Sequence, residues 1–271
     1  MAVHTSQSQI VAEILGLPIE KIKPVWGDSW VVPQTMQAVS SRMAMAMGTA
    51  SRRAAESILQ QLFEIAAPQL GVSPDGMEAE DGNIQVKGAP ETAIPFGTLV
   101  GSGGCITGVG DHPGASEFRS NFAMVIQAGS AYEVEVDMDS GAVNFLQAIN
   151  GIDCGRALNP DIIEGQVLGA GVSQMGAAMM HEVIYDPATG VVLNTSHSDY
   201  LYPTAADIPP TETVLVESID PWTAFGQKGV AEMGLCSPAQ GIINTIANAT
   251  GVWVRQIPIT PDVLLKALGK I

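Results

Sequence analysis

One carboxylate near the end of the chain stands in a glycine-rich loop, where it is a candidate general base. The loop covers residues 225–234 and reads FGQKGVAEMG, with Glu232 as its only acid. Burial in tight, apolar backbone raises the pKa of a carboxyl group toward neutrality, where it can accept a proton during catalysis. Ser237 and Pro238 follow as the predicted N-cap and first turn of a helix, whose N-terminus favours the ionised form instead. The sequence leaves open which effect dominates.

The other residues with chemical potential do not form recognisable metal or redox motifs. The three cysteines, Cys105, Cys154 and Cys236, are far apart and include no CxxC pair, so we expect free thiols rather than disulfides or an iron–sulfur cluster. The four histidines are not spaced as metal ligands. We therefore predict no side-chain metal site on this chain.

Composition indicates an acidic globular protein. The 271 residues are 46% hydrophobic, enough for a sizeable core, and the formal net charge is -16. This charge argues against nucleic acid and anionic membrane as partners, because both are bound through basic patches. Neither a signal peptide nor an apolar stretch of transmembrane length is visible, so we expect a cytoplasmic protein.

Two helices organise the predicted first lobe, residues 1–118. The first is amphipathic, begins near His4 and ends at Gly16. Because the sequence starts directly with this helix, we expect the domain to be one half of a larger domain. The second is long, over about residues 44–70. Its expected core face carries Ala54, Ile58, Leu62 and Ile65.

Less regular segments complete the first lobe. We predict a short strand over residues 22–26 and another over 84–87, after a turn at Asp81 and Gly82. Residues 88–118 are rich in Gly, Pro, Ser and Thr and read as a long irregular connection between the lobes.

The second lobe, residues 119–271, opens with a predicted meander. Strands are expected over residues 122–128, 131–138 and 143–150, with a hairpin turn at Asp139–Gly141. Later segments predict a hairpin near Asp186, a strand over 214–217, and two helices that begin at Pro238 and Pro261. Strands in hairpins with helices between them are typical of an α+β fold.

A helix opened by Asn159 and Pro160 lies between these strands. Gly165, Gly169 and Gly176 recur along it at helical spacing. Because glycine weakens a helix, this stripe indicates a close approach, either of another helix or of a ligand.

Several segments, taken in order over essentially the whole chain, resemble the xanthine dehydrogenase family of molybdenum hydroxylases. The residues 226–232, GQKGVAE, are similar to the catalytic loop of that family. The other matching segments are HT at 4–5, SR at 41–42, RRAAE at 52–56, YEVEVD at 132–137, NP at 159–160, EGQ at 164–166, PTAAD at 203–207 and the closing ANATG at 247–251. The resemblance covers the C-terminal half of the family's large subunit and implies a two-lobed molybdenum-cofactor-binding domain with antiparallel hairpins and packed helices.

Two positions depart from the family pattern. Met1 and Ala2 stand where the family has its Gln-Gly cofactor loop, and a methionine side chain cannot donate an amide hydrogen bond. Ala231 replaces the usual glycine before the catalytic glutamate, which requires a negative φ there. We expect the alanine to be tolerated and the loop to be completed by another chain.

The resemblance implies a heteromeric enzyme. The cofactor is a molybdopterin, expected in the cytosine dinucleotide form, shared with a second molybdopterin-binding half-subunit. The reaction is hydroxylation of an N-heterocycle or aldehyde with water as the oxygen source, and Glu232 is the base. Electrons leave to 2Fe-2S clusters and FAD on other subunits. The alternative function is a non-catalytic structural or interaction subunit derived from the same domain.

The resemblance also assigns cofactor-contacting residues, each with a plainer alternative. Ser40–Met43 match a cofactor-binding segment, or form a helix N-cap with a solvated arginine. Gln166 matches a polar residue near the metal, or is a helix-surface amide. Asn159 matches the family motif and is more simply explained as the N-cap of its helix. Lys228 forms an ion pair with a phosphate group or with Glu232, or is solvated. The residues carried over as cofactor-binding are Ser40, Ser41, Arg42, Met43, Asn159, Gln166, Lys228, Gly229, Val230 and Ala231.

Overall fold

The computed structural model describes residues 3–33, 35, 37–111 and 125–271. The chain divides into two compact units, which are described one at a time. Unit 1 comprises residues 1–124 and 219–228, and unit 2 comprises residues 125–218 and 229–271. The predicted lobe boundary at 118/119 lies outside the described residues.

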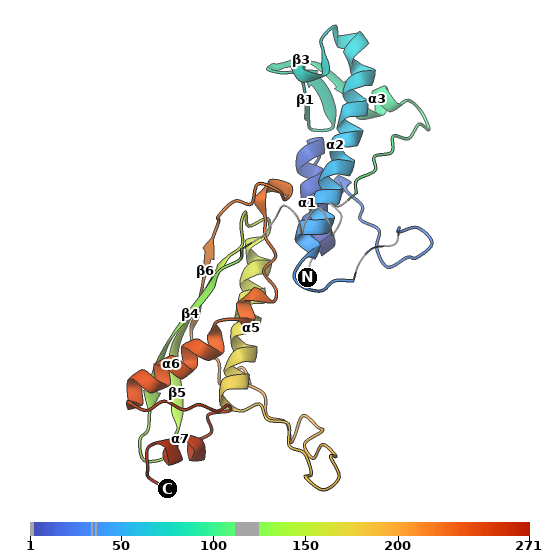
Figure 1. The fold of residues 1–271 in the computed structure, drawn as a ribbon. Coiled ribbons are helices and arrows are strands. Elements are labelled where there is room, and N and C mark those ends of the chain that lie inside the picture. Colours follow the sequence, from blue (N-terminus) through green and yellow to red (C-terminus); the bar gives the residue numbers. More distant parts are fainter. Residues whose placement is uncertain (1–2, 34, 36, 112–124) are drawn as a thin grey trace. The chain divides into compact units, whose positions relative to one another are not determined.

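Unit 1 is built on one long helix, α2, with α1 packed along it and a small sheet near its far end (Figure 1). The sheet has the order β1-β2-β3, and both strand pairs are antiparallel. The core between helix and sheet contains the buried side chains of Leu62, Ala66, Met77, Ile84 and Leu99. The elements of unit 1 are α1 (Val3–Leu15), η1 (Ile19–Lys21), α2 (Met43–Leu70), η2 (Pro74–Gly76), β1 (Met77–Glu80), β2 (Asn83–Val86), β3 (Ala89–Pro95), α3 (Phe96–Val100) and η3 (Ala224–Gly226).

Both predicted helices of this unit are confirmed, but the buried face of α2 is rotated from the expected one. Ala55, Leu62 and Ala66 are buried, whereas Ile65 is 40% exposed. The helix ends at Gly71, which adopts the left-handed conformation with φ 67° that favours glycine.

The strand expected over residues 22–26 is wrong. These residues are irregular, and Trp26 stacks on the ring of His4 in α1, with ring centroids 4.3 Å apart. Pro24 lacks a backbone donor for a ladder. The side chain of Trp26 therefore packs on a helix and not on a neighbouring strand.

The expectation of an irregular segment is also wrong for residues 89–100, which form β3 and α3. Gly88, with φ 73°, reverses the chain after β2. The hydroxyl of Thr92 then accepts a hydrogen bond from the Val86 N–H at 2.9 Å, at the irregularity in the pairing. Local turn chemistry thus overrides a composition rich in loop-forming residues.

Unit 2 is a three-stranded sheet covered by helices (Figure 1). The long strands β4 and β5 form the predicted hairpin, and the Asp137 carboxylate closes its turn by accepting from the Asp139 N–H at 2.9 Å. The strand β6 pairs parallel to β5, with Thr211 opposite Ala148. The elements of unit 2 are β4 (Ala128–Val136), β5 (Val143–Asp153), α5 (Pro160–Met179), β6 (Thr211–Val216), η4 (Met233–Leu235), α6 (Pro238–Thr250) and α7 (Pro261–Ala267).

The sequence prediction of an α+β fold is confirmed by these two units. Helix α6 packs on β4 and on α5, over a core of buried aliphatic side chains. Its largest fully buried members are Ile242, Ile246, Ile259 and Leu264. The strand predicted over residues 122–128 begins outside the described residues, and β4 begins at Ala128. None of the helices in the described ranges is long and apolar enough to span a membrane.

Candidate active site

Glu232 lies in unit 2 directly before η4, and its side chain is exposed on this chain. The neighbouring side chains of Val230 and Met233 pack inward against a buried apolar cluster. The members of that cluster are Ile152, Cys154 and Val167. The carboxylate therefore stands at the surface of a loop whose flanking residues are fixed in the core.

Gly234 holds the other side of this loop against helix α5. A Cβ atom at this position would lie 3.0 Å from the Cβ of Ala170 and 3.7 Å from the Cα of Val167. Real Cβ contacts are rarely that short, so glycine is what permits the approach. Ala231 is not among the described non-glycine residues with positive φ, as its side chain requires.

Gln166 belongs to the part of α5 that contacts η4. It directly precedes Val167 and is half-buried. Within the described part of the chain, its side-chain amide makes no hydrogen bond, so both its donor and its acceptor are available to a ligand. Unit 2 thus brings the Glu232 loop and the helix of Gln166 together.

The glycine stripe on α5 has two different causes. A Cβ atom at Gly165 or Gly169 would meet no described atom within 4 Å, so close packing against another part of this chain does not explain these two residues. A Cβ atom at Gly176, in contrast, would overlap the ring of His181. The first two glycines leave an open helix surface, and the third makes room for an aromatic side chain.

Asn159 caps α5, as its sequence context predicts. Its side-chain oxygen accepts a hydrogen bond from the Ile162 N–H at 3.3 Å, and Pro160 occupies the first turn. The Ser237 side chain, in contrast, does not cap α6. Its hydroxyl lies 2.8 Å from the hydroxyl of Ser130 on β4, which satisfies it there instead.

Ser40–Met43 form an unusual approach to α2 in unit 1. Ser40 and Ser41 have φ of 58° and 51°, in the left-handed region that costs a residue with a Cβ roughly 1–2 kcal/mol. Arg42, not a serine, occupies the N-cap position, without a side-chain capping bond. The alternative of a helix N-cap with a solvated arginine is therefore realised only in the position of Arg42, without a capping bond from its side chain. Strained backbone of this kind is found at ligand clamps.

Arg42 carries an unsatisfied donor. Its Nε atom is buried and has no hydrogen-bond partner in the described part of the chain. A buried donor without a partner costs about 1–3 kcal/mol, so such groups in native proteins call for an acceptor. The N-terminal end of α2 adds the partial positive charge of its dipole at the same place.

Gln227 was not singled out from the sequence, although it lies inside the motif. The residue is 3% exposed, and its Nε2 donates to the Ala44 carbonyl oxygen at 2.8 Å, one residue beyond Met43. The loop therefore reaches the first turn of α2 within unit 1. In the sequence, the only signal for this residue is its place between Gly226 and Lys228 in the motif. Its neighbour Lys228 is half-buried.

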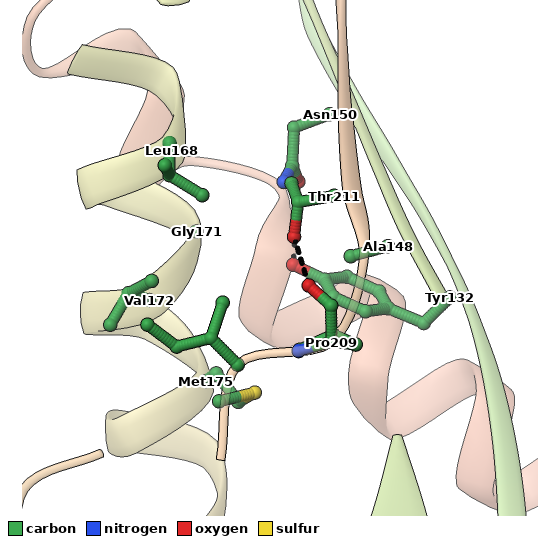
Figure 2. A pocket seen from close by; sticks show the side chains of 10 residues that line it. Tyr132, Ala148, Asn150, Leu168, Gly171, Val172, Met175, Pro209 and Thr211 are labelled. Atoms are coloured by element: carbon green, nitrogen blue, oxygen red, sulfur yellow. Dashed lines mark hydrogen bonds between the residues drawn. The ribbon is translucent and has the colours of Figure 1, made fainter. Parts of the chain in front are cut away.

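An apolar pocket opens in unit 2 between α5 and the sheet (Figure 2). It encloses about 230 Å³, its open mouth included, and Leu168, Val172 and Met175 of α5 face Tyr132 and Asn150 across it. The Tyr132 hydroxyl donates to Asn150 Oδ1 at 3.3 Å, and burial raises the pKa of Tyr132 to about 12. A phenol with that pKa stays protonated at neutral pH and acts there as a hydrogen-bond donor.

Comparison with known proteins identifies the family. The model of the molybdopterin cofactor-binding domain matches residues 2–209. The chain belongs to this family. The match ends before the Glu232 loop, which is covered by similarity to individual proteins.

Relatives of this molybdopterin cofactor-binding domain are large molybdenum-binding subunits. The chain is 31% identical to the nicotine 6-hydroxylase large subunit of Paenarthrobacter nicotinovorans, over 97% of the chain and 33% of the relative. It is 32% identical to the aldehyde oxidoreductase molybdenum-binding subunit PaoC of Escherichia coli K12, over 99% of the chain and 35% of the relative. Quinoline 2-oxidoreductase from Pseudomonas putida 86 superposes with a TM-score of 0.82 at 26% identity, over 98% of the chain and 35% of that chain.

The chain spans about one third of the length of these relatives. The family-model match and these relatives confirm the resemblance to the molybdenum-binding subunit of the xanthine dehydrogenase family.

The residues of this chain fit an anionic cofactor of that kind. Arg42 offers an unpartnered buried donor at the N-terminus of a 28-residue helix, beside two strained serines. This arrangement suits the phosphate groups of a pterin cofactor. The open surface at Gly165 and Gly169, next to the Gln166 amide, provides a second area without a covering side chain.

Proposed function

We propose that this chain forms one wall of the active site of a multi-subunit molybdenum hydroxylase. The enzyme converts a C–H bond and a water molecule into a C–OH group, two protons and two electrons. Its substrate is an N-heterocycle or an aldehyde, the two classes to which the named relatives point. The electrons pass to iron–sulfur and FAD subunits.

The observation that carries the proposal is the placement of Glu232. Its carboxylate is exposed, while Val230, Met233 and Gly234 fix the loop on the core of unit 2. A general base must be held in place and still reach a reacting proton. Glu232 meets both requirements and takes the proton at a carboxylate oxygen.

The remaining candidate residues bind and orient. The bound molybdopterin, which we propose is the cytosine dinucleotide form, supplies the redox chemistry by accepting the two electrons. Arg42 holds its phosphate groups, with the backbone of Ser40, Ser41 and Met43 beside it. Gln166 donates or accepts through its free amide. Gly229–Ala231 offer backbone N–H groups, Asn159 orients the helix that it caps, and Lys228 adds positive charge near the loop.

The exposure of Glu232 also supports a heteromeric assembly. A carboxylate base works best where water is excluded, and on this chain its side chain is open to solvent. We propose that a second molybdopterin-binding polypeptide closes over the loop, and that iron–sulfur and FAD subunits complete the enzyme.

The test is the substitution Glu232→Gln in the complete enzyme. The amide keeps the shape but cannot accept the proton, so turnover should fall by about 100- to 10,000-fold, the usual contribution of a general base. The molybdenum content, measured by plasma mass spectrometry, should stay unchanged. The matched control is Glu212→Gln on the exposed edge of β6, which should turn over as the wild type.

Two results would contradict the proposal. Wild-type turnover in Glu232→Gln would exclude Glu232 as the base. Absence of molybdenum from the intact wild-type assembly would instead support the alternative, a structural subunit derived from the same domain.

A further inference from the structure

The segment of unit 2 that follows α5 exposes a group of large apolar side chains. It covers residues 182–202, the gold loop after α5 in Figure 1, and we call it the arm. Within the described residues, none of these side chains belongs to a core cluster of either unit. An exposed apolar surface of this kind marks an interaction site. The side chains are between 46% and 60% exposed, and they are Val183, Ile184, Tyr185, Val191, Leu193 and Leu201.

The arm is folded as a short hairpin. Tyr185 and Val192 form an antiparallel bridge, and the Asp186 N–H donates to the Val191 carbonyl oxygen at 2.8 Å. Gly190, with φ 71°, turns the chain, and its N–H donates to the Asp186 carbonyl oxygen at 2.8 Å. The backbone of the arm is therefore held by its own hydrogen bonds.

A buried amide fixes the two strands of the arm to each other. Asn194 Oδ1 accepts from the Ile184 N–H at 2.9 Å, and its Nδ2 donates to the Glu182 carbonyl oxygen at 2.6 Å. The Leu193 N–H also donates to the Ile184 carbonyl oxygen, at 2.8 Å. Alternate residues of a strand point to the same side, so Ile184, Val191 and Leu193 share one apolar face. This face is preformed, which lowers the entropy cost of binding.

The base of the arm is attached to α5. The ring of His181 occupies the space that Gly176 leaves open, and it stacks on the ring of Tyr202 with centroids 4.7 Å apart. The Tyr202 hydroxyl lies 3.1 Å from the hydroxyl of Ser173 on α5. The arm is therefore anchored to the body of unit 2 at its base, while its apolar face is open.

The open face calls for a covering surface. In the described part of the chain, the arm pairs with no strand of either sheet. A hairpin of two strands is marginally stable alone in water, because nothing covers its apolar side. Burial of that side against another surface is favourable.

The charge of the arm argues against a second copy of this chain as that surface. The arm contains three acids, Glu182, Asp186 and Asp199, and neither lysine nor arginine. A second copy would add a formal net charge of -16. Like charges brought together across an interface oppose association. The charge therefore favours a different polypeptide, with an apolar groove and a basic rim.

The relatives indicate which polypeptide has this groove. The match covers 97% and 99% of this chain, but only 33% of the nicotine 6-hydroxylase large subunit and 35% of PaoC. In those proteins, the segment that matches this chain belongs to a much longer chain, whose other part is available to cover it. The counterpart of that other part is the second molybdopterin-binding polypeptide of the proposed function.

We propose that the arm is a docking element, whose apolar face of Ile184, Val191 and Leu193 enters an apolar groove with a basic rim on the second molybdopterin-binding polypeptide. The assignment rests on the proposed function, because it needs that polypeptide as the partner. It adds the surface through which this chain holds the partner.

The first test identifies the partner by photo-crosslinking in the complete enzyme. The photoreactive amino acid p-benzoylphenylalanine replaces Val191, whose side chain is exposed on this chain. Irradiation should join the chain to the second molybdopterin-binding polypeptide, and mass spectrometry of the product identifies both components. The readout does not depend on turnover.

The second test measures how tightly the assembly holds together. The double variant Val191→Ser/Leu193→Ser removes apolar surface from the docking face and leaves the backbone hydrogen bonds in place. On dilution of the purified complex, followed by mass photometry, the dissociation constant of the second polypeptide should rise about 10- to 100-fold. Because both side chains are exposed on this chain, the Tm of the chain itself should stay within about 2 °C. The matched control is Val25→Ser in unit 1, where the valine is similarly exposed, and its complex should dissociate as the wild type does.

The outcomes separate this inference from the proposed function. Crosslinking to a second copy of this chain, to an iron–sulfur or FAD subunit, or to no polypeptide overturns the docking role. A dissociation constant within twofold of the wild type in the double variant also overturns it, and so does an equal rise in Val25→Ser. The proposed function fails on other evidence, namely retained turnover in Glu232→Gln or an assembly without molybdenum.

Discussion

Replacing Asp153 should destabilise unit 2 more than replacing any exposed acid. Asp153 ends β5 and is 8% exposed. It accepts from the Gly155 N–H at 3.1 Å, from the Ser218 N–H at 3.2 Å and from the Ser218 hydroxyl. The group thereby joins the turn into α5 to the end of β6.

The size of the effect follows from the donors that lose their acceptor in Asp153→Ala. The Gly155 N–H is buried and cannot turn elsewhere, and a buried donor without a partner costs about 1–3 kcal/mol. Ser218 is exposed, so water can replace the acceptor of its N–H and of its hydroxyl. We therefore expect a loss of roughly 2 kcal/mol, which at about 2–4 °C per kcal/mol lowers Tm by roughly 6 °C.

The measurement is thermal unfolding followed by circular dichroism, with Asp153→Asn and Asp186→Ala alongside. Asp153→Asn keeps an acceptor oxygen, so its decrease in Tm should be less than half of the decrease in the alanine variant. Asp186→Ala removes an exposed carboxylate that accepts from the Ala188 N–H, and should change Tm little. An Asp153→Ala variant within 2 °C of the wild type, by this rough scale, would refute the reasoning.

Two further predictions concern the pocket tyrosine and the Glu232 loop. Burial raises the pKa of Tyr132 to about 12, so the folded state keeps its proton above pH 10, where the unfolded tyrosine ionises; stability should therefore fall as pH rises from 10 to 12, and Tyr132→Phe should flatten that fall in pH-dependent urea unfolding. A stability curve that keeps its slope in the phenylalanine variant would contradict this assignment. Gly234→Ala places a methyl group 3.0 Å from Ala170 Cβ and should lower kcat by about tenfold with molybdenum retained, whereas Gly97→Ala, with open space around it, should not. Equal kcat in the two glycine variants would show that the approach of Gly234 to α5 does not set the position of Glu232.

Periodicity and turn chemistry were sufficient to predict most elements. The helices α1, α2 and α6, the β4–β5 hairpin and the Asn159 cap follow from local signals that the structure confirms. The failures have a common physical reason. Residues 22–26 and 89–100 take their conformation from partners and turns that no local window shows, such as the ring of His4 for Trp26.

The candidate site was predicted in part, by motif rather than by geometry. The sequence pointed to Glu232 and Ser40–Met43, and their functional roles stay predictions. Gln227 was missed because the space for its amide is left by Gly48, which lies 179 positions earlier in the chain (227 − 48) and whose missing side chain leaves no pattern. Asp153 was missed because an acid at the end of a strand looks like a solvated one until its donors are placed around it.

The parallel pairing of β6 with β5 has a consequence for the order in which unit 2 folds. The β4–β5 hairpin closes through the six residues Asp137–Ala142, and can form in microseconds. β6 reaches its place only after residues 154–210, including the whole of α5, have been laid down. Because long loops must be closed before such a contact stabilises anything, β6 joins late. Until it does, one edge of β5 lacks its ladder partner, and a nascent chain offers that edge to any other strand.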